Sequence, residues 1–374
     1  MEWVAISYGA LDMRGQQDNP SQVDIMLLST EPSEPFGLIG PHADLWHRLC
    51  EKPISDDELT PEERALVREF AAAGIASSDP QHPARLRNVE QGWLTSPLHE
   101  LVYSLIGNVA RENGIDVIFI KGPVLQLQGL RNRHHSGDVD VLVDPDRIAE
   151  LAERLEAWGW THAQVRWEDS SLYHSVTMTP SGWGCEIDIH RHMPGFAVSD
   201  QTGFKLLLQH AEAKSFATVS VRIPDTPAHA VISALHLMRP QQGRNIASGN
   251  EEAAVRSLQT TGIEALSFAR KMRAEASLKE ELRRAFPEET INPSYDAPLN
   301  WKWRAEPNRL KRYLIMFRAA PLRVWPRMAY RSIWPDESTA ILIDNLYGGT
   351  ATSPIDARLK RLKRGILQQF NRWR

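Results

Sequence analysis

Short apolar runs and helical patterns alternate over the first 80 residues. Residues 23–28 and 37–39 flank a polar, proline-containing stretch, which predicts two short strands joined by a turn. Apolar positions then recur at helical spacing over residues 41–49. Residues 60–63 (Thr-Pro-Glu-Glu) combine an N-cap, a proline and first-turn acids, which predicts a second helix. The pattern therefore predicts a small winged-helix-like module over residues 1–80.

A mixed pattern of strands and helices follows. Residues 77–88 are polar, contain proline and show no periodicity, so we interpret them as a linker. Apolar residues recur with helical period from Ser96 to Asn113, where Gly114 is typical of a helix end. Similar patterns predict strands over 116–120, 138–143, 174–179 and 185–190, a hairpin turn at 180–182, and helices from 124 and over 147–158.

The pattern becomes helical after Pro224. Helices are predicted over residues 228–238, 251–273 and 309–319. The expected organisation has three domains, which are the N-terminal module (1–80), an α/β domain (90–223) and a helical C-terminal domain with a basic tail (224–374). The predicted fold class is α+β.

Composition and charge narrow the class of protein. The 374 residues include 43 Lys and Arg against 47 Asp and Glu, a net charge of −4, which gives no overall reason to expect a nucleic-acid or membrane partner. The two cysteines, Cys50 and Cys185, exclude a disulfide scaffold and a cysteine-rich zinc site within one chain. The N-terminus has no secretory pattern and no run of about 18 apolar residues occurs, so we expect a cytoplasmic protein with no membrane span.

Two local features depart from the overall composition and charge of the chain. Residues 356–374 carry seven Lys or Arg and one acid, a pattern typical of helices that touch phosphates, anionic lipid or an acidic surface. We favour the alternative that the tail helix packs on the body of the protein through Leu359, Leu362, Ile366, Leu367 and Phe370. Five of the 12 tryptophans lie in the C-terminal fifth of the chain, and four of these are expected to pack within the helical domain: Trp301, Trp303, Trp325 and Trp334.

The strongest chemical signal is a pair of aspartates on a predicted strand. Side chains alternate along residues 138–143, so Asp138 and Asp140 share one face and three valines share the other. This spacing holds the two carboxylates about 6–7 Å apart. At that separation they can bind one hard cation or bridge two.

Asp188 is the third candidate carboxylate, and Glu186 and His190 share its strand face. Mg²⁺ takes oxygen ligands and keeps substrate phosphates in its shell, so three such aspartates predict nucleotidyl or phosphoryl transfer on two metal ions. Asp188 is the expected acceptor of the proton from the attacking hydroxyl. The competing interpretation is a solvated strand face, which the small Ser136-Gly137 pair and the valines make less favoured.

These motifs resemble the uncharacterised nucleotidyltransferase family of the polymerase-β-type superfamily. The resemblance rests on Lys121-Gly122, residues 136–143 (SGDVDVLV), His174 and residues 187–190 (IDIH). It is specific from about residue 98 to 191 and weakens toward 350. It implies a polymerase-β-type mixed sheet, a nucleoside triphosphate as donor, and two Mg²⁺ ions, with Mn²⁺ as the alternative, held by Asp138, Asp140 and Asp188.

The resemblance also implies contacts to the nucleotide. Lys121-Gly122 replaces the Gly-Ser loop of better-known members, so Lys121 is expected to make a charge-assisted contact to phosphate. The arginine usual before the first aspartate corresponds to Arg133 or Arg131. The implied nucleotide-binding residues are Lys121, Gly122, Arg133, Ser136, Gly137 and His190.

Other histidines carry weaker signals. Neither His134-His135 nor His190-Arg191-His192 has the ordered Cys/His spacing of a zinc site. His236 lies in an apolar helical pattern and is interpreted as a core or interface residue.

The first module is similar to PqqD-like winged-helix domains, which bind leader peptides. The similarity rests on residues 23–28, 37–49 and 54–75, and it implies an exposed strand edge to which an extended peptide can add. A module that only packs against its neighbour is the alternative. The predicted acceptor is therefore a peptide or a small molecule, with RNA less favoured. Transfer of the γ-phosphoryl group and a non-catalytic, peptide-binding maturation protein on the same fold are the other hypotheses.

Overall fold

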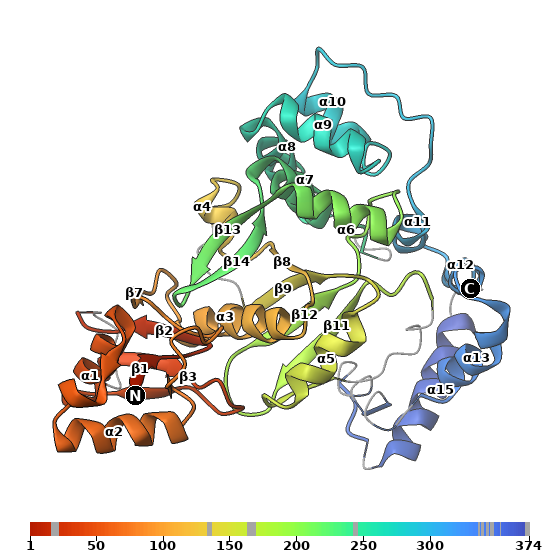
Figure 1. The fold of residues 1–374 in the computed structure, drawn as a ribbon. Coiled ribbons are helices and arrows are strands. Elements are labelled where there is room, and N and C mark those ends of the chain that lie inside the picture. Colours follow the sequence, from red (N-terminus) through yellow and green to blue (C-terminus); the bar gives the residue numbers. More distant parts are fainter. Residues whose placement is uncertain are drawn as a thin grey trace.

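The computed structural model describes residues 1–15, 22–132, 137–162, 170–241, 246–335, 337, 340–341, 344, 348–351 and 353–370. Its central feature is a five-stranded mixed sheet with the order β10-β11-β12-β9-β8 (Figure 1). Strands β12 and β9 pair in parallel, whereas the other neighbours are antiparallel. The predicted α+β class is confirmed. The strands are β8 (Val117–Ile120), β9 (Asp138–Val143), β10 (Trp160–His162), β11 (Ser175–Pro180) and β12 (Glu186–His190).

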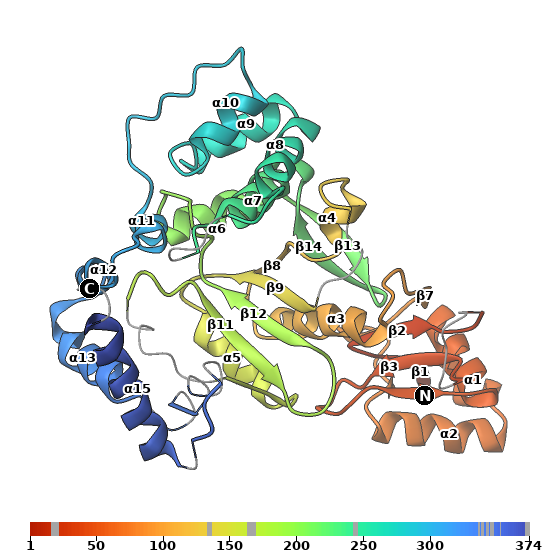
Figure 2. The same cartoon turned by 180° about the vertical axis from the view of Figure 1, so that it is seen from behind.

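Each face of this sheet packs against a separate core. Val139, Val141 and Val143 of β9 join a core with two helices on one face, whereas Leu142 joins a core with further helices on the other. The alternation predicted for this strand is therefore confirmed, and helices lie on both faces of the sheet (Figures 1 and 2). The first face is covered by α3 (Pro97–Glu112) and α5 (Ile148–Glu156), and the second by α6 (Asp200–Gln209), α7 (Thr226–Met238) and α8 (Asn250–Thr260).

The N-terminal module contains two small sheets and two helices. The predicted hairpin is present, because β3 and β4 pair antiparallel. Both predicted helices form, and Thr60 closes a capping box with Glu63 at the start of the second. The sheets have the orders β5-β1-β6 and β4-β3-β2-β7. The elements are β1 (Glu2–Ala5), β2 (Gly9–Asp12), β3 (Ile25–Leu28), β4 (Phe36–Leu38), α1 (Pro41–Glu51), β5 (Ile54–Ser55), α2 (Pro61–Ala72), β6 (Ala76–Ser77) and β7 (Glu90–Gln91).

This module shares a core with the central sheet. Val4, Ile6 and Leu11 belong to the same buried cluster as the apolar face of α3. Residues 77–88 differ from a free linker, because Ala84 and Leu86 are buried and Arg85 forms a bridge with Ile6. The boundary at residue 80 stays a prediction, but the module and the sheet pack as neighbours.

A hairpin that the sequence pattern does not predict lies beside α3. Strands β13 (Ala211–Phe216) and β14 (Val219–Pro224) are joined by Ala217 and Thr218, which have positive φ angles of 45° and 69°. A two-residue turn of this conformation is usually made of Asn and Gly, so the sequence carries no hairpin signal at this point.

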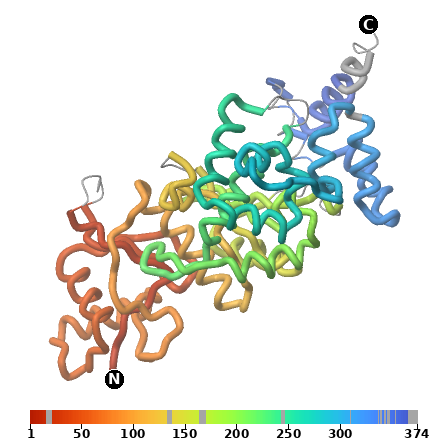
Figure 3. The backbone as a smooth tube through the Cα atoms, turned by 90° about the horizontal axis from the view of Figure 1, so that it is seen from above, coloured from red at the N-terminus to blue at the C-terminus, as the bar shows by residue number. Residues whose placement is uncertain are grey.

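The C-terminal region is helical, and it lies at the opposite end of the molecule from the N-terminal module (Figure 3). The single helix predicted over 251–273 is wrong. Helix α8 ends at Thr260 and α9 begins at Ile263, because Gly262 between them has a φ of 61°, outside the helical region. The remaining helices are α9 (Ile263–Lys271), α10 (Lys279–Ala285), α11 (Leu299–Ala305), α12 (Arg309–Arg318), α13 (Trp325–Ile333) and α15 (Pro354–Phe370).

The basic tail helix α15 bonds to the end of α13 through its arginines. Arg358 lies over the ring of Trp334 and donates to the carbonyl of Pro335, and Arg361 donates to the carbonyl of Ser332. The expectation that Leu359 packs on the body is wrong, because this side chain is 55% exposed. Leu362 is half-buried, and the side chains of Ile366, Leu367 and Phe370 lie outside the described residues.

The tryptophans of this region pack as predicted. Trp301 is buried in the core that contains α7, whereas Trp303 and Trp325 pack around Met316 and Met328. Within the described part of the chain, no helix combines the length and apolar character needed to cross a bilayer.

The buried carboxylate of Glu100 joins three segments. Its two oxygens accept from the backbone N–H groups of Trp93, Leu94 and Ala217, at 3.0, 3.1 and 3.0 Å. Burial raises the pKa of Glu100, and the three N–H donors oppose this shift. Glu100 therefore fixes the entry to α3 and the turn of the β13–β14 hairpin.

Glu100→Ala should lower the free energy of unfolding by about 3 kcal/mol, because three buried N–H groups lose their acceptor. Urea denaturation of the full chain measures this loss. Glu153→Ala, at an exposed position of α5, is the control and should change stability by less than about 0.5 kcal/mol. A Glu100 variant as stable as the control would contradict the role of this carboxylate.

Candidate active site

The predicted carboxylates come together on two neighbouring strands. The parallel pairing of β9 and β12 places Asp140 opposite Asp188 and Asp138 opposite Glu186. Asp140 is only 4% exposed, whereas Asp138 and Asp188 are half-buried. Three aspartates therefore converge on one face of the sheet.

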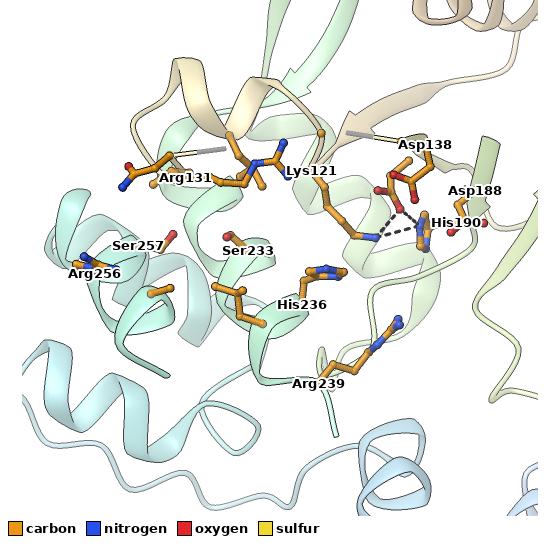
Figure 4. A pocket seen from close by; sticks show the side chains of 18 of the residues that line it. Lys121, Arg131, Asp138, Asp188, His190, Ser233, His236, Arg239, Arg256 and Ser257 are labelled. Carbon is orange, nitrogen blue, oxygen red and sulfur yellow. Dashed lines mark hydrogen bonds and ion pairs between the residues drawn. The ribbon is translucent and has the colours of Figure 1, made fainter. Parts of the chain in front are cut away.

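This face borders a cavity of about 930 Å³, which lies between the sheet and the helices α7 and α8 (Figure 4). Arg133, Ser136 and the pair His134-His135 lie outside the described residues. Arg131, the alternative to Arg133, lines the cavity. The predicted site residues that also line it are Lys121, Gly122, Gly137, Asp138, Asp140, Asp188 and His190.

Lys121, Asp140 and His190 form a compact buried cluster. The Nζ of Lys121 lies 2.5 Å from Oδ1 of Asp140, and Nε2 of His190 lies 2.6 Å from the same oxygen (Figure 4). Both side chains of the ion pair are less than 10% exposed. A buried carboxylate needs such compensation, because an unpaired charge in the interior costs several kcal/mol.

The contacts of His190 define its tautomer. Lys121 can only donate, and the contact between its Nζ and His190 Nε2 is long at 3.4 Å. His190 therefore donates its Nε2–H to Asp140, which leaves Nδ1 as a buried nitrogen without a hydrogen-bond partner among the described residues. Burial and the neighbouring Lys121 ammonium hold the pKa of His190 well below its ordinary value. The ring is thus a neutral donor to Asp140.

The donor atoms of this face fit a hard cation. One ligand atom from each of Asp140, Asp188 and His190 lies within 4.8 Å of the others. Oδ1 of Asp188 also accepts from Oγ1 of Thr177 on β11, at 2.5 Å, which orients the carboxylate. Carboxylate oxygens suit Mg²⁺ and Mn²⁺.

The backbone of Lys121 is held in a left-handed conformation. Lys121 has a φ of 60°, which is uncommon for a residue with a side chain. Its N–H donates to Nε2 of His229 at 2.6 Å, and Nδ1 of His229 lies 2.6 Å from Oε1 of Gln128. Because Nε2 of His229 accepts, Nδ1 must carry the proton, so this histidine is neutral. Burial lowers the pKa of His229 to about 3.

Gly122 continues this turn and cannot be replaced by a larger residue. Its φ is 59°, and a Cβ at this position would lie 2.5 Å from the hydroxyl oxygen of Tyr103. The Lys-Gly pair at the end of β8 therefore combines a charged side chain with a close backbone approach to the cavity.

Several residues of the cavity escape prediction from the sequence. Arg239 follows α7, Arg256 and Ser257 lie on α8, and all three line the cavity (Figure 4). His236, interpreted from the sequence as a core or interface residue, does not lie in the core, because it is exposed and lines the cavity. These positions lie in ordinary helical patterns, and only the packing of α7 and α8 over the sheet reveals them.

The segment of the chain that carries this cavity matches the model of a known family. Residues 98–248 match the model of a family described as "uncharacterised nucleotidyltransferase", which confirms the predicted resemblance for this segment and the predicted class of enzyme. No curated protein matches the chain.

Three solved structures are similar to parts of this chain at low sequence identity. The lincosamide antibiotic adenylyltransferase LnuA, bound to lincomycin, is 13% identical over 43% of this chain and 94% of its own, with a TM-score of 0.28. The antibiotic-resistance factor ANT(2'')-Ia is 13% identical over 52% and 96%, with a TM-score of 0.31. The CCA-adding enzyme of Thermotoga maritima is 13% identical over 69% and 77%, with a TM-score of 0.23.

The low pKa of His229 makes stability depend on pH. The folded protein disfavours the protonated ring, so the contribution of His229 is complete above its unfolded pKa of about 6.5 and is lost as the pH falls toward about 3. At pH 4 the loss amounts to about 3 kcal/mol. Gln in place of His229 can accept from Lys121 and donate to Gln128 without titrating.

His229→Gln should therefore flatten the dependence of unfolding free energy on pH between 6.5 and 4. Chemical denaturation of both proteins at several pH values measures the two slopes. Equal slopes would show that His229 is not held neutral in the folded protein. His229→Ala is expected to be less stable than His229→Gln at pH 7, because the N–H of Lys121 then lacks an acceptor.

Proposed function

We propose that this protein transfers a nucleoside monophosphate from a nucleoside triphosphate to the hydroxyl group of an acceptor and releases pyrophosphate. The observation that carries the proposal is the register of β9 and β12, which aligns Asp140 with Asp188 beside Asp138 at the cavity. The Lys121-Gly122 turn lies at the same cavity, where it is suited to a phosphate chain.

The three aspartates would hold divalent cations, Mg²⁺ or Mn²⁺. When bound, the cations would supply charge stabilisation at the phosphates and lower the pKa of the attacking hydroxyl. The ammonium of Lys121 adds a fixed positive charge next to Asp140.

We infer from the order of the strands which side of the site takes the donor and which side takes the acceptor. Lys121-Gly122 follow β8, the paired aspartates lie on β9, and Asp188 lies on β12, farther along the sheet. Phosphoryl groups are displaced in line, so the leaving group and the attacking oxygen lie on opposite sides of the phosphorus. Pyrophosphate would therefore leave on the β8 side, where Lys121 binds it, and the acceptor hydroxyl would enter on the β12 side. Asp188, oriented by Thr177, would receive its proton.

Asp138→Asn, Asp140→Asn and Asp188→Asn should each reduce nucleotidyl transfer by about 10²-fold or more, because each removes a charged ligand atom from the site. The assay incubates the full chain with each labelled triphosphate and Mg²⁺, and measures pyrophosphate release. Asp116→Asn, at an exposed aspartate before β8, is the matched control and should keep full activity. Undiminished turnover in the Asp138, Asp140 and Asp188 variants would contradict the proposal.

The same assay separates the competing hypotheses. Nucleoside diphosphate in place of pyrophosphate would indicate transfer of the γ-phosphoryl group. A protein that binds the triphosphate without turning it over, with every acceptor tested, would indicate a non-catalytic protein.

We also propose that the N-terminal module recruits a peptide that carries the acceptor. Strand β4 ends its sheet and pairs only with β3 among the described strands, so its outer edge can accept another strand. Packing of this module on α3 leaves that edge at the far end of its sheet from β7.

Calorimetry of the full chain with peptides encoded beside its gene tests peptide recruitment. At least one peptide should bind, and a scrambled peptide of the same composition should not. If no encoded peptide binds, the module does not recruit the acceptor.

A further inference from the structure

Arg239 is a half-buried cation at the edge of the active-site cavity, and no described residue forms an ion pair with it. It directly follows α7 and lines the cavity (Figure 4), which His174, Ser175 and Asp188 also line. Among the described residues no carboxylate oxygen lies within 4.0 Å of its guanidinium, although Asp140 and Asp188 act on it at longer range. Its one hydrogen bond within the described chain runs from Nη1 to Nε2 of His174, at 3.2 Å.

Among the described residues, the groups nearest to Arg239 are neutral or positive, and the carboxylates of Asp140 and Asp188 act on it only at longer range. Because Nε2 of His174 accepts from Arg239, this ring is neutral, and burial holds the pKa of His174 well below its ordinary value. Burial lowers the pKa of Arg239, and burial together with the charge of Arg239 lowers the pKa of Arg304 on α11 to about 10. A half-buried guanidinium with most of its five N–H donors unused is suited to bind an anion.

The position of Arg239 distinguishes it from the phosphate contacts of the donor. Lys121 and Gly122 lie on the β8 side of the aspartates, whereas Arg239 contacts His174, which directly precedes β11 on the opposite side. In-line displacement separates the leaving pyrophosphate from the attacking hydroxyl along this direction. Arg239 therefore stands on the side of the cavity from which the acceptor enters, and the carboxylate of Asp188, the proposed proton acceptor, acts on it at longer range.

We propose that Arg239 binds an anionic group of the acceptor, so that the acceptor is a hydroxyl compound that carries a phosphate or a carboxylate near the reacting hydroxyl. This inference rests on the proposed nucleotidyl transfer. The fork of a guanidinium matches both kinds of anion through paired N–H···O bonds. Such a contact would orient the hydroxyl toward Asp188 and would exclude neutral acceptors.

Calorimetry of the full chain tests this subsite. The protein is saturated with Mg²⁺ and a non-hydrolysable nucleoside triphosphate analogue, which fills the donor site, and is then titrated with inorganic phosphate or with acetate. The wild type should bind one equivalent of the preferred anion, and the tighter of the two probes identifies the anionic group of the acceptor. Arg239→Gln should weaken this binding by about tenfold or more, because a charge-assisted pair is lost.

Three controls make the result decisive. Arg239→Gln should bind the nucleotide analogue as tightly as the wild type, which also reports that it is folded. Arg239→Lys should keep part of the anion affinity, since it retains the charge and loses the fork. Arg256→Gln, the same change across the cavity on α8, should leave anion binding unchanged.

Three results would overturn the inference: no binding of either anion to the wild type, unchanged binding to Arg239→Gln, or a parallel loss of nucleotide affinity that places Arg239 in the donor site. Failure of the wild type to bind the analogue would instead contradict the proposed function. In that case, phosphate titration without the analogue still tests Arg239.

Discussion

The ion pair between Lys121 and Asp140 is the interaction on which the site depends. Both side chains are less than 10% exposed, so removing either partner would leave an uncompensated charge in the interior, at a cost of about 3–5 kcal/mol. The pair also joins the end of β8 to β9, and His190 extends it to β12 through the same carboxylate oxygen. Three neighbouring strands are thus fixed at one point by charge and hydrogen bonding.

A second layer of buried polar groups supports the ion pair between Lys121 and Asp140. His229 on α7 accepts the N–H of Lys121, and Gln128 contacts His229 and donates to the carbonyl of Pro224 at the end of β14. These contacts hold Lys121 in its left-handed conformation and aim its side chain at Asp140. Helix α7 therefore both covers the cavity and positions the charged turn beneath it.

The parts of the site that follow strand periodicity could be predicted from the sequence. The alternation over residues 138–143 and 185–190 placed Asp138, Asp140, Asp188 and His190 on one face, and the parallel register of β9 and β12 unites them. Lys121-Gly122 could be identified because the family resemblance implies a phosphate-binding turn directly after the apolar strand at residues 116–120. Such local patterns persist in the fold because each strand packs one face against a core.

The other site residues and elements depend on contacts between segments that are distant in the sequence, and such contacts leave no local sequence pattern. Arg239, His229 and Ser257 reach the cavity only because α7 and α8 fold back over the sheet. The β13–β14 hairpin lacked a turn signal because Ala217 and Thr218 occupy positions where glycine and asparagine are usual. The break at Gly262 in the predicted long helix shows that one glycine can redirect a periodic segment.

Mn²⁺ binding, followed by electron paramagnetic resonance on the full chain, tests the central claim that these carboxylates form a metal-dependent nucleotidyl-transfer site. With a non-hydrolysable nucleoside triphosphate present, the account predicts two Mn²⁺ ions per chain, and loss of this binding in Asp188→Asn. Equal Mn²⁺ binding by the wild type and this variant, or none by the wild type, would contradict it.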